Sequence, residues 1–225
     1  MAQDTILTLG IIGGTGKEGS GLAFRWAHAG YEVIIGSRDP ERAGATAEAI
    51  NEKLGRVGVV HGASNLEAAQ TCDIAIVTVP YSAHQATLES VKDALAGKIL
   101  VDVTVPLNPE KRRTVSLPSG GSAGAEAQAI LGESVKVVSA FQNIGFGHLD
   151  DLDATIDCDV LVTGNDRQAK QQVIALAKAI GMDAFDAGPI ANAVVAESLA
   201  SALININVRH KVTSAGIRIS GIPRT

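Results

Sequence analysis

The chain has 225 residues, of which 46% are hydrophobic and only 3% aromatic, with 24 glycines and a formal net charge of -5. This length suits one large or two small domains, and such a composition is typical of α/β proteins with closely packed elements. The negative charge and the lack of a basic run argue against a nucleic-acid surface. Cys72 and Cys158 match no metal or redox spacing, so we expect two small buried hydrophobes.

Two features predict a cytoplasmic protein. Unpaired cysteines suit a reducing compartment, and Asp4 interrupts the start of the chain, where a signal peptide would need an apolar run. No apolar run approaches the length of a membrane span, so we expect no membrane partner.

The predicted elements begin with a strand at residues 7–12, which are apolar and β-branched. The run Gly14-Thr15-Gly16-Lys17-Glu18-Gly19 then fits G-x-G-x-x-G, and an amphipathic helix follows. The first glycine of this motif allows a tight turn, the second lets a pyrophosphate approach the backbone, and the third lets helix and strand pack closely. Because free N–H groups at a helix start bind phosphates, this context favours a dinucleotide site over a merely structural turn.

The second predicted strand, residues 31–35, leads to Ser37 and Arg38. NAD-binding folds usually place an acid at this strand end to accept from the ribose hydroxyls. A hydroxyl and a guanidinium can instead bind a 2′-phosphate, with Arg42 nearby on the next helix. The alternative is that Arg38 is a solvated charge and Asp39 takes the ribose, although Asp before proline is a helix-start signal. The strand end therefore favours NADP over NAD.

The rest of the chain alternates strands and helices, as in a doubly wound, mostly parallel sheet. Further strands are predicted at residues 57–60, 73–79, 98–103, 135–141, 160–163 and 183–186, and helices at residues 40–54, 65–70, 81–96, 123–131, 166–180 and 192–209. A polar, glycine-containing run at residues 142–149 directly follows a strand, where α/β sheets keep ligand contacts.

We therefore predict an α/β fold with an N-terminal doubly wound Rossmann dinucleotide-binding domain, residues 1–141, and a small C-terminal α/β lobe, residues 142–225. The last predicted helix is apolar nearly all round, so it needs cover on several faces. We expect it to pack across the second lobe and to contribute to a homodimer interface.

Several motifs together resemble those of the NADPH-dependent reductases of coenzyme F420, which couple NADP to a deazaflavin. The likeness runs from about residue 9 to about residue 220. It is carried by G-G-T-G-K-E-G from Gly13, G-S-R from Gly36, C-D-I-A-I-V-T-V-P from Cys72, V-V-S-A-F-Q-N from Val137, D-A-G-P-I from Asp186 and E-S-L from Glu197. Many Rossmann proteins share the first motif, and its combination with the last three is far more specific.

The resemblance implies which residues contact the two coenzymes. The loop after the first strand would hold the pyrophosphate, the second strand end the 2′-phosphate, and the segment from Gln142 to Phe146 both rings. Relatives can read His-Thr-Ile-Pro-Ala in that segment, so we expect Phe146 to narrow the slot. The expected cofactor-binding residues are Gly14, Thr15, Gly16, Lys17, Glu18, Ser37, Arg38, Arg42, Val79, Pro80, Tyr81, Gln85, Gln142, Asn143, Ile144 and Phe146.

The implied reaction is hydride transfer between NADP(H) and the deazaflavin F420 as co-substrate, which needs placement rather than a catalytic side chain or a metal. One alternative is an NADP-dependent reductase of another small substrate such as an imine, which would normally need a proton donor and a larger helical domain. The other is a non-catalytic NADP-binding module that reports redox state to a partner.

Overall fold

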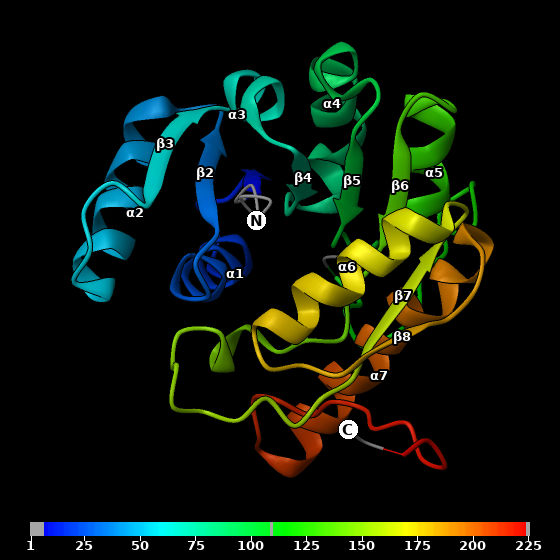
Figure 1. The fold of residues 1–225 in the computed structure, drawn as a ribbon. Helices are drawn as coiled ribbons and strands as arrows, with labels where there is room; N and C mark the ends of the chain where they lie inside the picture. Colours follow the sequence, from blue (N-terminus) through cyan, green and yellow to red (C-terminus); the bar gives the residue numbers. More distant parts are fainter. Residues whose placement is uncertain (1–6, 109, 224–225) are drawn as a thin grey trace.

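The computed structural model describes residues 7–108 and 110–223, so the argument from Asp4 lies outside the described residues. Within them the strands form a single sheet of eight in the order β3-β2-β1-β4-β5-β6-β7-β8 (Figure 1). The strands are β1 (Thr8–Ile12), β2 (Glu32–Ser37), β3 (Val60–Ser64), β4 (Ile74–Val77), β5 (Ile99–Asp102), β6 (Lys136–Ser139), β7 (Val160–Gly164) and β8 (Ala184–Asp186). All neighbouring pairs are parallel except β6 with β7.

Helices cover both faces of this sheet (Figure 1). They are α1 (Lys17–His28), α2 (Pro40–Leu54), α3 (Asn65–Thr71), α4 (Tyr81–Val91), α5 (Ala123–Leu131), α6 (Arg167–Ala179) and α7 (Ala193–His210). The apolar faces of α1, α2 and α6 share one core, and those of α3, α4 and α5 share the other. The predicted α/β fold of Rossmann type is confirmed, because a mostly parallel sheet needs helices on both faces.

The amphipathic pattern of α1 explains how the first helix is fixed. Its residues Leu22 and Trp26 are fully buried, as the helical spacing predicts. The Trp26 Nε1–H donates to the Leu176 carbonyl at 3.0 Å, and its ring meets Phe141 edge-to-face with centroids 5.7 Å apart. One aromatic side chain therefore joins α1 to α6 and to the end of β6, far away in the sequence.

The prediction of a third strand at residues 57–60 is wrong. Val57 is 98% exposed in the turn before the strand, and Gly58 has a φ of 73°. The strand is Val60–Ser64. It lies at the sheet edge and pairs with β2 alone, a position that requires little apolar surface. The Asn51 side chain positions it by bonding both the N–H and the C=O of Val60. The valine-rich sequence led to the predicted position of this strand. Its actual position is set by pairing with β2 and by contact with α2.

The sheet continues across the predicted domain boundary at residues 141 and 142. Ser139 of β6 pairs with Thr163 of β7 in antiparallel register, and β8 extends the sheet beyond β7. The division into residues 1–141 and 142–225 stays a prediction.

The segment Ile190–His210 has 21 residues and contains an 18-residue window with a mean hydropathy of 1.3, enough to cross a membrane by length and composition alone. The expectation that no apolar run approaches a membrane span is therefore wrong by this measure. The core helix of a soluble protein passes the same test, and α7 packs on α5 and β7 in this fold. Cys72 and Cys158 are buried and unpaired, as expected.

Candidate functional site

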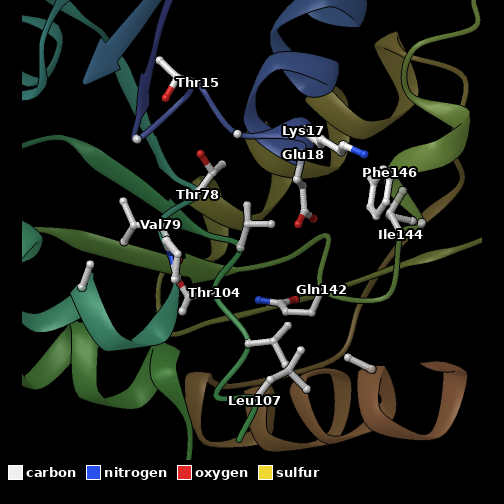
Figure 2. A pocket seen from close by; sticks show the side chains of 18 of the residues that line it. Thr15, Lys17, Glu18, Thr78, Val79, Thr104, Leu107, Gln142, Ile144 and Phe146 are labelled. Carbon is white, nitrogen blue, oxygen red and sulfur yellow. The ribbon is translucent and has the colours of Figure 1, made fainter. Parts of the chain in front are cut away.

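A cavity of about 670 Å³ lies at the carboxyl ends of the parallel strands. Residues that follow β1, β2, β4, β5 and β6 line it, and α7 closes one side (Figure 2). The strand order reverses between β1 and β4, since β2 and β3 lie to one side of β1 and β5 and β6 to the other side of β4. Open α/β sheets bind ligands at such a switch point, so fold and cavity agree.

The glycine-rich turn forms one end of this cavity. The Gly14 N–H donates to the carbonyls of Ile11 and Gly36, at 3.1 and 3.0 Å, so this residue holds the turn and does not line the cavity. A Cβ at Gly19 would lie 2.5 Å from Thr78 Oγ1, whereas one at Gly16 would meet nothing within 4 Å. The third glycine therefore allows close packing, and the second faces open space beside the start of α1. Thr15, Gly16, Lys17 and Glu18 all line the cavity.

Ser37, Arg38 and Arg42 line the cavity beside this turn. Asp39 is the N-cap of α2, as the sequence predicts: its Oδ1 accepts from the N–H groups of Glu41 and Arg42, at 3.1 and 3.2 Å. The Asp39 carboxylate is thus engaged by the backbone, while the exposed Arg38 guanidinium is open to a ligand. This geometry favours the reading of Ser37 and Arg38 as a 2′-phosphate site.

The turn after β4 faces the cavity through Val79 and Pro80, but Tyr81 and Gln85 do not line it. The Tyr81 hydroxyl donates to Glu126 at 2.7 Å, and exposed Gln85 donates to Glu89 at 2.9 Å. The cavity-facing stripe of α4 consists of Ala83 and Thr87. Both pairs have an i, i+4 spacing, and they lie on different faces of one helix, so a coenzyme contact by Tyr81 and Gln85 stays a prediction.

Gln142 forms the floor of the cavity opposite the glycine-rich turn (Figure 2). Its Nε2 donates to the Asp102 carbonyl and to Ser139 Oγ, both at 2.7 Å. A carbonyl oxygen can accept only from the NH₂ group of an amide, so the contact with Asp102 fixes which end of the Gln142 amide is Nε2 and which is Oε1. Its buried Oε1 has no hydrogen-bond partner among the described residues. A buried acceptor of this kind is costly unless a ligand supplies the missing N–H or O–H.

The neighbouring segment supplies the wall beside Gln142. Asn143 donates to the Asp159 carbonyl at 2.7 Å, which ties the segment to the start of β7. Ile144 and Phe146 line the cavity, and the 49% exposed Phe146 ring lies 5.1 Å from Lys17 Nζ. The cation–π contact brings the glycine-rich turn and this segment together across the cavity mouth.

Sequence reasoning missed a wall of the cavity that combines a mid-chain segment with residues near the C-terminal end of the chain. The segment after β5 and one face of α7 with the loop beyond it contribute Thr104, Val105, Leu107, Ala200, Leu203, Ile204, Asn207, Thr213 and Ala215. The all-round apolarity of α7 indicated several packed faces but not which one meets a ligand.

Behind Gln142 lies a buried pair, His84 and Asp102, with Nε2 and Oδ2 2.7 Å apart. Burial lowers the pKa of His84, but the hydrogen bond and charge of Asp102 outweigh it and raise that pKa overall. Nearby, Glu197 accepts from the N–H groups of Ala123 and Gly124 at the start of α5, and burial raises its pKa to about 7. Neither His84 nor Glu197 lines the cavity; the pair of His84 and Asp102 is tied to the floor because the Asp102 carbonyl accepts from Gln142.

Comparison with known proteins places this arrangement in a family. The family described as "NADP oxidoreductase coenzyme F420-dependent" matches residues 8–106. An F420-dependent NADP reductase of Methanothermobacter marburgensis is 41% identical over 223 residues, which cover 96% of this chain and 100% of that protein. The chain belongs to the F420-dependent NADP reductase family.

Two further comparisons agree with this placement. An F420-dependent NADP reductase of Methanocaldococcus jannaschii is 40% identical over 223 residues, covering 96% of this chain and 99% of the relative. A crystal structure of a proposed F420-dependent NADP reductase from Arthrobacter has a TM-score of 0.82 at 28% identity and covers 95% of this chain and 99% of that one. The resemblance found in the motifs is thus confirmed over nearly the whole length.

Proposed function

We propose that this chain is an F420:NADP oxidoreductase that transfers hydride directly between NADP(H) and coenzyme F420 in the cavity described above. The observation that carries the proposal is that one cavity joins a phosphate-binding turn, a cationic strand end and an apolar slot with an unpartnered polar floor. NADP needs the first two features, and two stacked flat rings need the third. When bound, the nicotinamide and deazaflavin rings supply the redox chemistry themselves.

The phosphate end of the cavity holds NADP in this proposal. The free N–H groups at the start of α1, from Lys17 and Glu18 onward, donate to the pyrophosphate beside Gly16, where no side chain blocks the approach. Ser37 donates to the 2′-phosphate, and Arg38 and Arg42 pair with its charge.

The other end of the cavity orients the rings. Gln142 Oε1 accepts an N–H from the nicotinamide carboxamide or the deazaflavin pyrimidine edge, which satisfies its buried acceptor. Val79 and Pro80 line the nicotinamide half, while Ile144 and Phe146 meet the deazaflavin and exclude water. Asn143 holds this segment in place through the Asp159 carbonyl.

The decisive experiment mixes the purified protein with NADPH and oxidised F420 and follows the loss of deazaflavin absorbance, with NADH in a parallel reaction. Rapid bleaching with NADPH and little with NADH is the expected result. Binding of NADPH without bleaching would contradict the F420 assignment and would leave a reductase of another acceptor. An imine panel would then separate that reductase from a non-catalytic NADP-binding module.

We further propose a homodimer built on α7. Val195, Leu199, Ala202 and Ile206 follow one another at helical spacing and are exposed or half-buried, whereas Ile204 on the opposite face lines the cavity. An exposed apolar stripe of this kind is typical of a subunit interface. Sedimentation of the wild type and of Val195→Asp tests it: a dimer that dissociates in the variant is expected, and a monomeric wild type would contradict it.

The domain roles and the compartment are also proposals. Residues 1–141 would bind NADP, and residues 142–225 would contribute the deazaflavin site and the dimer contacts. The buried, unpaired Cys72 and Cys158 support a reducing, cytoplasmic compartment.

A further inference from the structure

Glu18 places a carboxyl group inside the coenzyme cavity. It lies in the first turn of α1, and Figure 2 shows its side chain pointing into the cavity on the side that faces Gln142. Among the described residues that line the cavity, Glu18 is the only acid. Within the described part of the chain its carboxyl also makes no ion pair, because the nearby cation Lys17 reaches toward Phe146 instead.

An ionised carboxylate fits this position poorly once the coenzyme is bound. The pyrophosphate that the start of α1 would hold carries two negative charges, and like charges at close range favour the protonated form of an acid. On the opposite wall Gln142 offers a buried, unpartnered acceptor, and its own donor is already engaged by the Asp102 carbonyl and Ser139 Oγ, so this side chain has no free N–H for a carboxylate. A neutral carboxyl, in contrast, presents an O–H that can donate to an oxygen of the bound coenzyme.

We propose that Glu18 is a coenzyme contact that works in its protonated form, donating a hydrogen bond inside the cavity, so that NADPH binding in alkaline solution is coupled to the uptake of one proton. The inference rests on the proposed function in one respect, namely that the cavity binds NADP. It goes beyond that function because it makes the affinity for the coenzyme depend on pH through one named side chain.

The free protein already tends toward this state: the Glu18 side chain is half-buried in the cavity wall, and this loss of hydration raises its pKa to about 8. Bound phosphate charge would raise that pKa further. Between pH 7 and pH 9 the affinity for NADPH should therefore fall by about tenfold, because each unit above the pKa of the free protein makes the binding-competent form ten times rarer. The 2′-phosphate itself titrates at about pH 6, so about nine-tenths or more of it is doubly charged over this range.

Other charged groups around the cavity must be separated from Glu18. The cations that face it are Lys17 from α1, Arg38 from the end of β2 and Arg42 from α2. Behind Gln142 lies the buried His84 and Asp102 pair, with Glu197 and its pKa of about 7 nearby, and all three are retained in a Glu18 variant. Glu18→Gln keeps the shape of the side chain and an N–H donor but removes the titrating group, so any pH dependence that remains in it reports the other groups.

The test is a titration of the full-length protein with NADPH at pH 7, 8 and 9. The wild type and the control Glu48→Gln, an exposed residue of α2 outside the cavity, should lose about tenfold in affinity between pH 7 and pH 9, while Glu18→Gln should give a flat profile. A wild-type affinity that does not change with pH, or a Glu18→Gln profile as steep as the wild type, would overturn the proposal.

A second measurement does not depend on any variant. Calorimetry of NADPH binding to the wild type at pH 8, in two buffers of different ionisation enthalpy, should show uptake of about half a proton per coenzyme, since the pKa of the free carboxyl is about 8. No uptake would refute the role of Glu18 even if the protein reduces F420. Proton-coupled binding without any F420 reduction would instead refute the proposed reaction and keep this inference.

Discussion

Replacement of Arg38 by alanine tests how the chain selects NADP. Arg38 is exposed at the end of β2 and lines the cavity beside buried Ser37. The substitution removes one guanidinium from the proposed 2′-phosphate site and leaves the helix cap at Asp39 untouched, because that cap uses backbone N–H groups of Glu41 and Arg42. The fold should therefore remain intact while one contact to the coenzyme is lost.

The magnitude follows from the exposure of Arg38. A hydrogen bond to a charged group contributes about 1.5–3 kcal/mol, and solvent screening at an exposed site favours the lower part of that range. A loss of about 1.5–2 kcal/mol corresponds to an affinity for NADPH that is about ten- to thirtyfold weaker. NADH carries no 2′-phosphate, so its affinity should change little.

Fluorescence titrations with NADPH and NADH measure both affinities at a fixed salt concentration. Lys178→Ala on α6 is the matched control, because it removes the same charge from an exposed position outside the cavity. If Arg38→Ala weakens NADPH and NADH equally, or if Lys178→Ala weakens NADPH as much, Arg38 does not recognise the 2′-phosphate and the NADP preference has another source.

Three further substitutions separate coenzyme binding from stability. Gly16→Ala should leave the urea midpoint nearly unchanged, since its Cβ meets nothing within 4 Å, yet weaken NADPH binding in titrations by crowding the pyrophosphate. Gly19→Ala should lower the midpoint as well, because its Cβ would come within 2.5 Å of Thr78 Oγ1; equal midpoints for both variants would contradict the packing argument. Trp26→Ala should cost about 3–5 kcal/mol of unfolding free energy by circular dichroism. A loss below about 1 kcal/mol would show that its bond to Leu176 and its burial matter little.

The fold could be predicted wherever local pattern and tertiary environment agree. The apolar strands β1 and β4 and the helix start at Asp39 follow from the sequence alone, since buried parallel strands are continuously apolar and caps are local hydrogen bonds. The third strand could not be found in this way. An edge strand contains few apolar residues, and its position depends on pairing with β2 and on the Asn51 side chain.

The candidate site likewise has parts that local sequence predicts and parts that only packing decides. The glycine-rich turn follows β1, and Ser37 and Arg38 lie at the end of β2. Each is a short local segment, so its chemistry can be predicted from the sequence. Tyr81 and Gln85 were expected among the cofactor-binding residues, but the rotation of α4 presents Ala83 and Thr87 to the cavity. A helix fixes which residues share a face, and only packing on its neighbours decides which face is inward.

By itself, the sequence determined the α/β fold, the glycine-rich turn and the cationic strand end, because the patterns that indicate them lie in residues close together in the chain. Tertiary structure alone decided that α7 closes the cavity, that Gln142 keeps an unpartnered acceptor in its floor and that Glu18 points into it. Those features join segments more than a hundred residues apart, and the contacts that orient them are absent until the sheet and both helical layers have assembled.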